Sequence, residues 1–194
     1  MRKVKISADS TCDLGPELLA KYDVAIQPLH IILGDETFRD GVDMTPDEIY
    51  ATYDEKQILP QTAAPNPGEY MEHFKQFTDK GYEVVHISLG SGISSSHQHA
   101  KLAASELEGV YVIDSGNLST GSGHLVIEAA ERAEKGLGGS TIFAEIENLR
   151  NRVHASFVID KLTYLREGGR CSALTVFSAN LLNIRPSIEV DTDG

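Results

Sequence analysis

The stretch that decides the fold is Val84–Ile113, which reads VVHISLGSGISSSHQHAKLAASELEGVYVI. It contains a short apolar run, a turn rich in glycine and serine, an amphipathic segment and a second apolar run: Val84–Ser88, Gly90–Ser94, Ser95–Leu107 and Val110–Ile113. This order predicts a strand, a turn, a helix and a further strand. A strand, crossover helix and strand form a βαβ unit, and such units build parallel sheets.

The same alternation continues on both sides of this unit. Further strands are predicted at 4–8, 24–33, 153–159 and 188–190, and further helices begin near residues 16, 45, 68, 120, 140 and 161. Pro28 favours an irregular or edge strand, and the three prolines of Pro60–Pro67 predict an ordered loop. The predicted fold class is therefore α/β, with a parallel sheet in a three-layer amino-terminal domain.

The length of 194 residues suits one domain and part of a second. The predicted boundary lies near Phe157, so that residues 1–157 form the amino-terminal α/β domain. Residues 158–194 are too short for a comfortable independent domain and are expected to be the start of an incomplete second α/β domain. The last strand runs into a turn without a continuation, which favours a truncated chain.

The charge balance excludes several classes of partner. The sequence has 29 acidic and 17 basic side chains and a formal net charge of −12, which repels phosphate backbones and anionic lipid headgroups. Nucleic acid binding and stable membrane insertion are not expected, and the absence of a signal-peptide pattern favours the cytoplasm. Cys12 and Cys171 lack metal-ligand or redox spacing, so two reduced thiols are expected.

The turn Gly90–Ser96 is the first candidate site. It joins a strand to a helix and directs backbone N–H groups and hydroxyls to one point, an arrangement that binds anions, although the serines could simply cap the helix. A dinucleotide site is the rival interpretation, because Asp114 follows the next strand where a ribose-binding acid would lie. Ser95 occupies the position of the third glycine in the dinucleotide-binding motif, and this disfavours a dinucleotide site. No cofactor is expected.

Other polar residues have both a functional and a plain structural interpretation. Thr62 lies in the loop with the prolines, and Arg170 follows two glycines, so its guanidinium could reach a carboxylate. Turn formation explains Thr62 equally well, and a lone arginine such as Arg170 is more often an ordinary surface charge. Residues 9–11 are interpreted mainly as helix caps, and His97 and His99 as solvated helix residues, because i and i+2 positions do not face each other.

Six dispersed motifs resemble the DegV family, in the right order along the whole chain: Asp9–Leu14, the Thr62 and Pro65 loop, Ile93–Ala100, Val112–Ser115, Tyr164–Arg170 and Leu181–Pro186. Members of this family are fatty-acid-binding subunits, called FakB in Gram-positive bacteria, that present the acyl carboxylate to a separate ATP-dependent kinase for phospholipid synthesis. The resemblance implies the DegV (EDD-type) fold and a non-catalytic lipid carrier.

The resemblance also implies which residues hold the carboxylate. The family's headgroup threonine, serine and arginine fall on Thr62, Ser94 and Arg170, and Ser95 is expected beside them at the start of the helix. This sequence departs from the family pattern at Ser95, Ser96 and His97, and no histidine follows His154 to supply the family's carboxylate-contacting histidine. The alternative is a nucleotide- or phosphate-using enzyme with its site at Gly90–Ser96.

Overall fold

A computed structural model describes residues 2–159, 162, 165 and 185–191. The chain divides into two compact units that are discontinuous in sequence. The first contains Met1–Leu29, Ala64–Ala155 and Val190–Gly194, and the second His30–Ala63 and Ser156–Glu189. These compact units are not the same as domains that fold independently. The predicted domain boundary at residue 157 therefore stays a prediction.

The first unit is built on a four-stranded parallel sheet in the order β2-β1-β6-β7. Its strands are β1 Val4–Asp9, β2 Ala25–Gln27, β6 Glu83–Ser88 and β7 Val110–Asp114. The predicted strand 24–33 is interrupted at Pro28 and Leu29, and its first part is the edge strand β2. Pro28 has no backbone N–H to donate to a sheet, which agrees with an interruption next to an edge strand. The predicted parallel α/β fold is confirmed.

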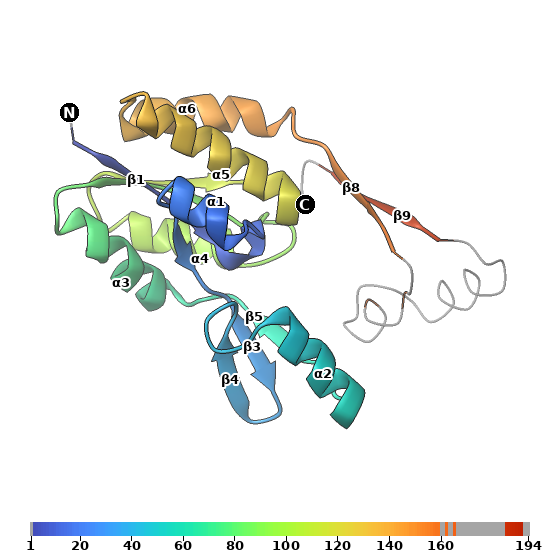
Figure 1. Cartoon of the computed structure of the whole chain (residues 1–194). Helices are drawn as coiled ribbons and strands as arrows, with labels where there is room; N and C mark the ends of the chain where they lie inside the picture. Colours follow the sequence, from blue (N-terminus) through green and yellow to red (C-terminus); the bar gives the residue numbers. More distant parts are fainter. Residues whose placement is uncertain (1, 160–161, 163–164, 166–184, 192–194) are drawn as a thin grey trace. The chain divides into compact units, whose positions relative to one another are not determined.

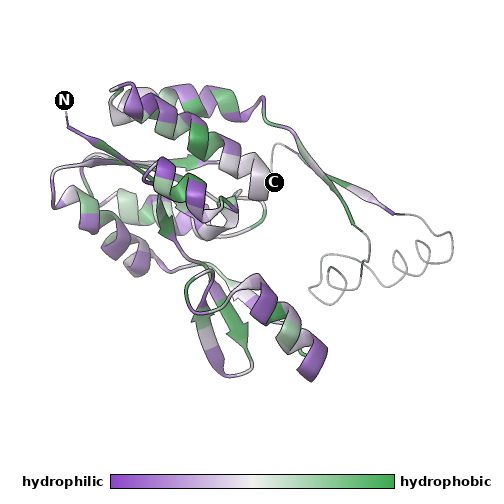
Figure 2. Cartoon of the chain, viewed as in Figure 1, coloured by the Kyte–Doolittle hydropathy of each residue, from purple (hydrophilic) through white to green (hydrophobic). Residues whose placement is uncertain are grey.

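Helices cover both faces of this sheet, as Figure 1 shows for α5 and α6 on one side and α3 and α4 on the other. These helices are α3 Pro67–Thr78, α4 Ser96–Ala104, α5 Ser119–Glu134 and α6 Gly139–Arg150. Figure 2 shows hydrophilic and hydrophobic segments alternating along α3, α5 and α6, the pattern of helices with one face on a core. The unit is therefore a three-layer α/β/α structure.

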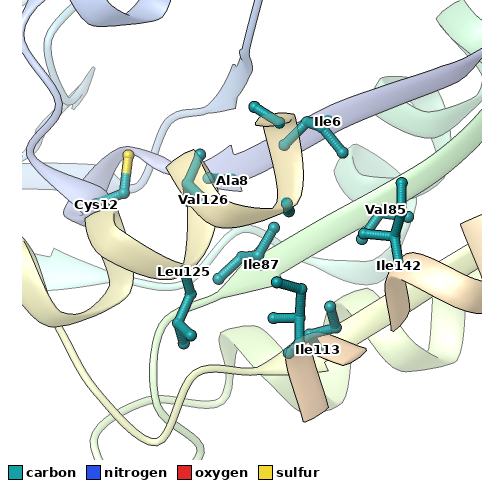
Figure 3. Packing of buried hydrophobic residues seen from close by; sticks show 12 residues of the cluster. Ile6, Ala8, Cys12, Val85, Ile87, Ile113, Leu125, Val126 and Ile142 are labelled. Atoms are coloured by element: carbon teal, nitrogen blue, oxygen red, sulfur yellow. The ribbon is translucent and has the colours of Figure 1, made fainter. Parts of the chain in front are cut away.

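The two faces of the sheet bury different kinds of side chain. Ile6, Val85 and Ile87 point toward α5 and α6 and form the larger apolar cluster, part of which is drawn in Figure 3. Alternate strand residues point to opposite faces, so Ser7 and His86 belong to the side of α3 and α4. The register places Ser7 beside His86. One face is thus apolar, and the other contains a buried polar layer.

Helix starts follow the local sequence. Asn66 caps α3, and Asn66 and Glu69 form a capping box in which each side chain accepts from the other residue's backbone N–H. The short helix α1, Pro16–Lys21, begins with proline at its first position and ends with Lys21, which complements the helix dipole. Both starts depend on residues that are close in sequence: the capping partners of α3 are three residues apart, and the proline of α1 is its first residue.

The second unit contains an antiparallel sheet in the order β4-β3-β5, followed along the chain by a two-stranded sheet of β8 and β9. Its elements are β3 His30–Leu33, β4 Glu36–Arg39, α2 Pro46–Lys56, β5 Gln61–Ala63, β8 Ala155–Val158 and β9 Ser187–Val190. The prediction that Pro60–Pro67 is a loop was wrong in part, because Gln61–Ala63 forms the strand β5 and pairs with β3. The helix predicted near residue 161 lies outside the described residues, apart from residues 162 and 165.

Candidate functional site

The candidate site lies where β1 and β6 end. The next strand in the sequence, β2, pairs with one edge of β1, and β6 pairs with the other edge. The strand order therefore changes direction at β1. In open α/β sheets, ligands bind outside the carboxyl ends of the strands at such a switch point. The side chains and turns that follow Asp9 and Ser88 therefore define the place to search.

The turn after β6 is held by backbone hydrogen bonds. The amides of Ile93 and Ser94 donate to Gly90 O at 3.0 and 3.2 Å, and Gly90 N donates to Asn117 O at 2.9 Å. The Asp114 carboxylate accepts from the amides of Ser91 and Gly116, each at 3.0 Å. The turn is thus fastened to the segment that follows β7.

Replacement of Gly90 by alanine is expected to lower the free energy of unfolding by about 1–3 kcal/mol, because overpacking forces backbone shifts. A Cβ at this position would lie 2.8 Å from Asn117 N and 3.1 Å from Gly116 C, both backbone atoms. Urea unfolding would measure the loss. Gly15→Ala is the matched control, because a Cβ at Gly15 meets nothing within 4 Å, and an equal effect in both variants would refute the packing argument.

Asp114 does not have the free carboxylate that a ribose-binding residue needs. Partial burial raises its pKa, but hydrogen bonds from Ser91 and Gly116 outweigh burial and lower it below the usual value. Arg150 Nη1 lies 3.6 Å from Oδ2 and donates to the Asp114 carbonyl at 2.6 Å. The carboxylate thus braces the turn, which is a structural role that the sequence did not reveal.

Ser94 and Ser95 are brought together at the start of α4. Ser94 is half-buried, and Ser95 is the exposed N-cap residue, whose side chain makes no capping hydrogen bond. Both line an open hollow of about 390 Å³ with Ser91, Gly92, Ile93 and Gln98. A larger hollow of about 570 Å³ is lined by residues at the amino-terminal end of β1, such as Val4 and the preceding Lys3, so it does not adjoin this site.

The structure does not test the other two predicted site residues. Thr62 belongs to the second unit, where it lies in β5 opposite Ile31 and is exposed. Arg170 lies outside the described residues. The carboxylate-binding set of Thr62, Ser94, Ser95 and Arg170 therefore stays a prediction.

Asp9 is the central residue of the buried polar layer. Its side chain makes no cap hydrogen bond, so the capping interpretation was wrong for this residue. Tyr70 Oη donates to Oδ1 at 2.7 Å, and Leu89 N donates to Oδ2 at 2.7 Å. His86 Nε2 lies 3.3 Å from Oδ1. Asp9 is 1% exposed, and such a group is tolerable only with several donors around it.

Ser7 continues the layer away from Asp9. Its hydroxyl lies 2.9 Å from His86 Nδ1 and 2.7 Å from His73 Nε2. Burial and the neighbouring His86 lower the pKa of His73 to about 3. His73 is therefore neutral at physiological pH.

Sequence reasoning missed Asp9, Tyr70, His73 and His86 as a group. One signal was present: His86 interrupts an otherwise apolar buried strand, and Tyr70 and His73 occupy the i and i+3 positions of the apolar face of α3. Polar side chains at core positions need partners. The identity of these partners could not be inferred from neighbouring residues in the sequence, since Tyr70 and Leu89 lie 61 and 80 residues from Asp9.

The expectation that His97 and His99 are solvated was wrong. His97 Nδ1 lies 3.0 Å from Ser88 Oγ, which itself donates to the Ile113 carbonyl, so the imidazole donates to the serine. Burial lowers the pKa of His97. His99 Nδ1 lies 2.8 Å from Pro65 O and therefore donates to it. Both side chains connect α4 to neighbouring segments.

Other chemistry was searched for in the described part of the chain. Burial raises the pKa of the Cys12 thiol to about 11, which makes it a poor nucleophile. Among these residues no cluster of His, Cys, Asp and Glu could hold a metal ion, and no helix has the length and apolar character to cross a bilayer. The polar layer at Asp9 and the Ser94 turn are thus the principal candidate features.

The fold and the switch-point turn define a class: an α/β protein with a candidate ligand site at the carboxyl ends of its parallel strands. The chain belongs to the DegV family. The model of this family, which is described as uncharacterised, matches residues 3–194. A DegV domain-containing protein of Clostridium perfringens is 34% identical over 192 residues, which cover 98% of this chain and 69% of that protein.

Solved structures of the family have the same fold. A DegV family protein from Thermus thermophilus, described as fatty acid binding, has a TM-score of 0.85 and 31% identity, and the match covers 100% of this chain and 69% of that chain. A stearic acid-binding protein from Eubacterium ventriosum has a TM-score of 0.85, 30% identity and coverage of 100% and 68%. DegV of Bacillus subtilis, described as a fatty acid binding protein, has a TM-score of 0.84, 28% identity and coverage of 98% and 69%.

Proposed function

We propose that this protein binds a long-chain fatty acid in the cytoplasm and presents its carboxyl group to a separate ATP-dependent fatty acid kinase, without catalysing a reaction itself. One observation supports this most strongly: solved structures described as fatty-acid-binding proteins superpose on the whole chain with TM-scores of 0.85. Thr62, Ser94, Ser95 and Arg170 are the proposed headgroup residues.

The energetics of such a carrier are favourable. A saturated chain of ordinary length has about fourteen methylenes, each worth roughly 0.8 kcal/mol on burial, or on the order of 11 kcal/mol before association and ordering costs. Affinity can therefore come from the tail. The headgroup residues need only satisfy the polar atoms of the carboxyl group, because an unpaired polar group is costly to desolvate. A carrier of this kind requires no general base.

Native mass spectrometry of the purified chain tests the proposal. A retained mass equal to one fatty acid, identified after extraction, is the expected result. Added fatty acid should also raise the melting temperature, since a ligand that binds only the folded state stabilises it. A chain that retains nucleotide, takes up no added fatty acid and shows no melting shift would contradict the proposal and favour an enzyme acting on nucleotide or phosphate.

Ser94→Ala is expected to weaken fatty acid binding about fivefold, because one hydrogen bond contributes about 1 kcal/mol. Isothermal titration calorimetry with palmitate measures the change in Kd. Ser105→Ala is the matched control: Ser105 is an exposed serine at the other end of α4, and its hydroxyl donates to Leu102 O. Equal affinity of parent and Ser94→Ala would remove Ser94 from the site.

A further inference from the structure

The buried carboxylate of Asp9 is bonded to the segment that leads into the candidate site. Its Oδ2 accepts from Leu89 N at 2.7 Å, and Leu89 stands between the end of β6 and Gly90. The direction of this bond is fixed, because a backbone N–H group can only donate. Asp9 is 1% exposed and is not among the residues that line the hollow at Ser94, so it can act on that site only through its neighbours.

Leu89 N points toward β1 because of its place in the sheet. Successive amides of a central strand point alternately to the two neighbouring strands. Glu83 N, at the start of β6, donates to Lys3 O on the side of β1. Gly90 N donates to Asn117 O on the side of β7. Leu89 lies an even number of positions after Glu83 and directly before Gly90, so it presents its N–H group to β1.

The backbone pairing of β1 and β6 stops just before this amide. The paired residues of the two strands end at Ala8 and Ile87. β1 itself ends at Asp9, and a 3₁₀ helix begins at Ser10. The side chain of Asp9 therefore continues the pairing by one bond beyond the backbone ladder, at the point where the chain leaves β6 for the turn.

The position of Ser94 depends on that of residues 89–91. The three amides of these residues donate to acceptors outside the turn: Leu89 N to Asp9 Oδ2, Gly90 N to Asn117 O and Ser91 N to Asp114 Oδ1. Of these acceptors only Asp9 belongs to β1, so it holds this segment from the side opposite to β7. Ser94 N in turn donates to Gly90 O at 3.2 Å, which ties Ser94 to the anchored residues.

We propose that Asp9 is a positioning residue of the ligand site: through Leu89 N it fixes the point at which the turn leaves the sheet, and thereby holds Ser94 and Ser95 where they line the hollow. Without the carboxylate, the N–H group of the buried Leu89 would lack its acceptor, and an unsatisfied buried donor is costly. The backbone is then expected to shift until this group reaches another acceptor or water, and the turn shifts with it. The inference rests on the proposed function, because it assumes that the turn holds the headgroup of a fatty acid.

Palmitate affinity separates a positioning role from a purely structural one. Asp9→Ala is expected to raise the Kd about tenfold, more than the loss of the Ser94 hydroxyl alone, because a displaced turn misplaces both serines. Ser7→Ala is the matched control. Ser7 is a buried polar residue of the same strand whose hydroxyl bonds His73 and His86 but no residue of the turn, so this variant should lose stability and bind palmitate as the parent does. Isothermal titration calorimetry well below the melting temperatures measures the three Kd values.

Hydrogen exchange of the Leu89 amide, measured by NMR, reports the bond itself. This amide should exchange faster in Asp9→Ala than in the parent or in Ser7→Ala, because only Asp9→Ala removes its acceptor.

Asp9→Asn is the conservative variant that should rescue binding. The Tyr70 hydroxyl, which donates to Asp9 Oδ1, can also accept a hydrogen bond, whereas Leu89 N cannot. The side-chain oxygen of asparagine is therefore expected to face Leu89 N, and its NH₂ group to face Tyr70. This variant should keep the Leu89 amide protected and bind palmitate as the parent does, although it is less stable.

Each other outcome is decisive. Parental affinity in a folded Asp9→Ala variant would overturn the inference and leave the proposed function intact, and so would an equal loss of affinity in Asp9→Ala and Ser7→Ala. If thermal melting shows that Asp9→Ala does not fold, Asp9→Asn decides. Affinity that follows the protection of the Leu89 amide supports the inference, and lost affinity with a protected amide, or parental affinity with an unprotected one, contradicts it. Failure of the parent to bind palmitate would overturn the proposed function, and the inference with it.

Discussion

Replacement of Asp9 by alanine is expected to lower the free energy of unfolding by about 3–5 kcal/mol, the range for removing one member of a buried charged network. The substitution leaves Tyr70 Oη and Leu89 N without their acceptor in a region closed to water. Each unsatisfied buried donor costs about 1–3 kcal/mol. Since domains of this size have total stabilities of about 5–15 kcal/mol, much of the fold's stability would be lost.

Urea unfolding monitored by circular dichroism measures this effect. Asp54→Ala is the matched control, because Asp54 is an exposed residue of α2 in the other unit, and its substitution should change the stability by less than about 0.5 kcal/mol. Asp9→Asn keeps the shape but must point an NH₂ group at one of the donors, so an intermediate loss of about 1–3 kcal/mol is expected. A loss below about 1 kcal/mol in Asp9→Ala would show that the network is not a stabilising core element.

The second large effect is a dependence of stability on pH caused by His73. Burial first, and the neighbouring His86 second, lower the pKa of this imidazole to about 3 from a usual value of 6.5. Between these pH values the unfolded chain binds a proton at His73 that the folded chain does not. Stability therefore decreases as the pH falls below 6.5, by up to about 1.4 kcal/mol per pH unit from this residue, and is retained above 6.5.

The measurement compares the free energy of unfolding of the parent and His73→Gln from pH 7.5 to pH 4.5. The parent should lose about 2–3 kcal/mol more than the variant over this range, because glutamine does not titrate. His124→Gln is the control, since His124 is an exposed histidine of α5, and it should follow the parent. Parallel curves for the parent and His73→Gln would show that His73 takes up its proton in the folded state.

Local patterns predicted the elements of the first unit well. The alternation of apolar runs with amphipathic segments predicted β1, β6, β7 and the helices between them, because these signals depend on residues within one or two turns of each other. Pro28 predicted the interruption before β3 for the same reason. Gln61–Ala63 was missed as a strand, because its paired residues in β3 lie 29 to 33 positions away in the sequence and only this pairing makes the segment regular.

The candidate site was predictable only in its surface part. The Gly90–Ser96 turn is visible in the sequence because a strand, glycines and serines follow one another directly. The roles of Asp114, His97 and His99 were not visible, since each is defined by a partner from another element: Ser91, Ser88 and Pro65. Capping and solvent exposure are sensible expectations only while such partners are unknown.

The sequence by itself determined the parallel α/β fold, the position of the turn at the end of β6 and, through dispersed motifs, membership of the DegV family. Only the tertiary structure decided that Asp9 is a buried acceptor of hydrogen bonds from Tyr70 and Leu89. The physical reason is that periodicity reports which face of an element is buried, whereas the direction of a hydrogen bond depends on which donors the folded chain brings to the same point.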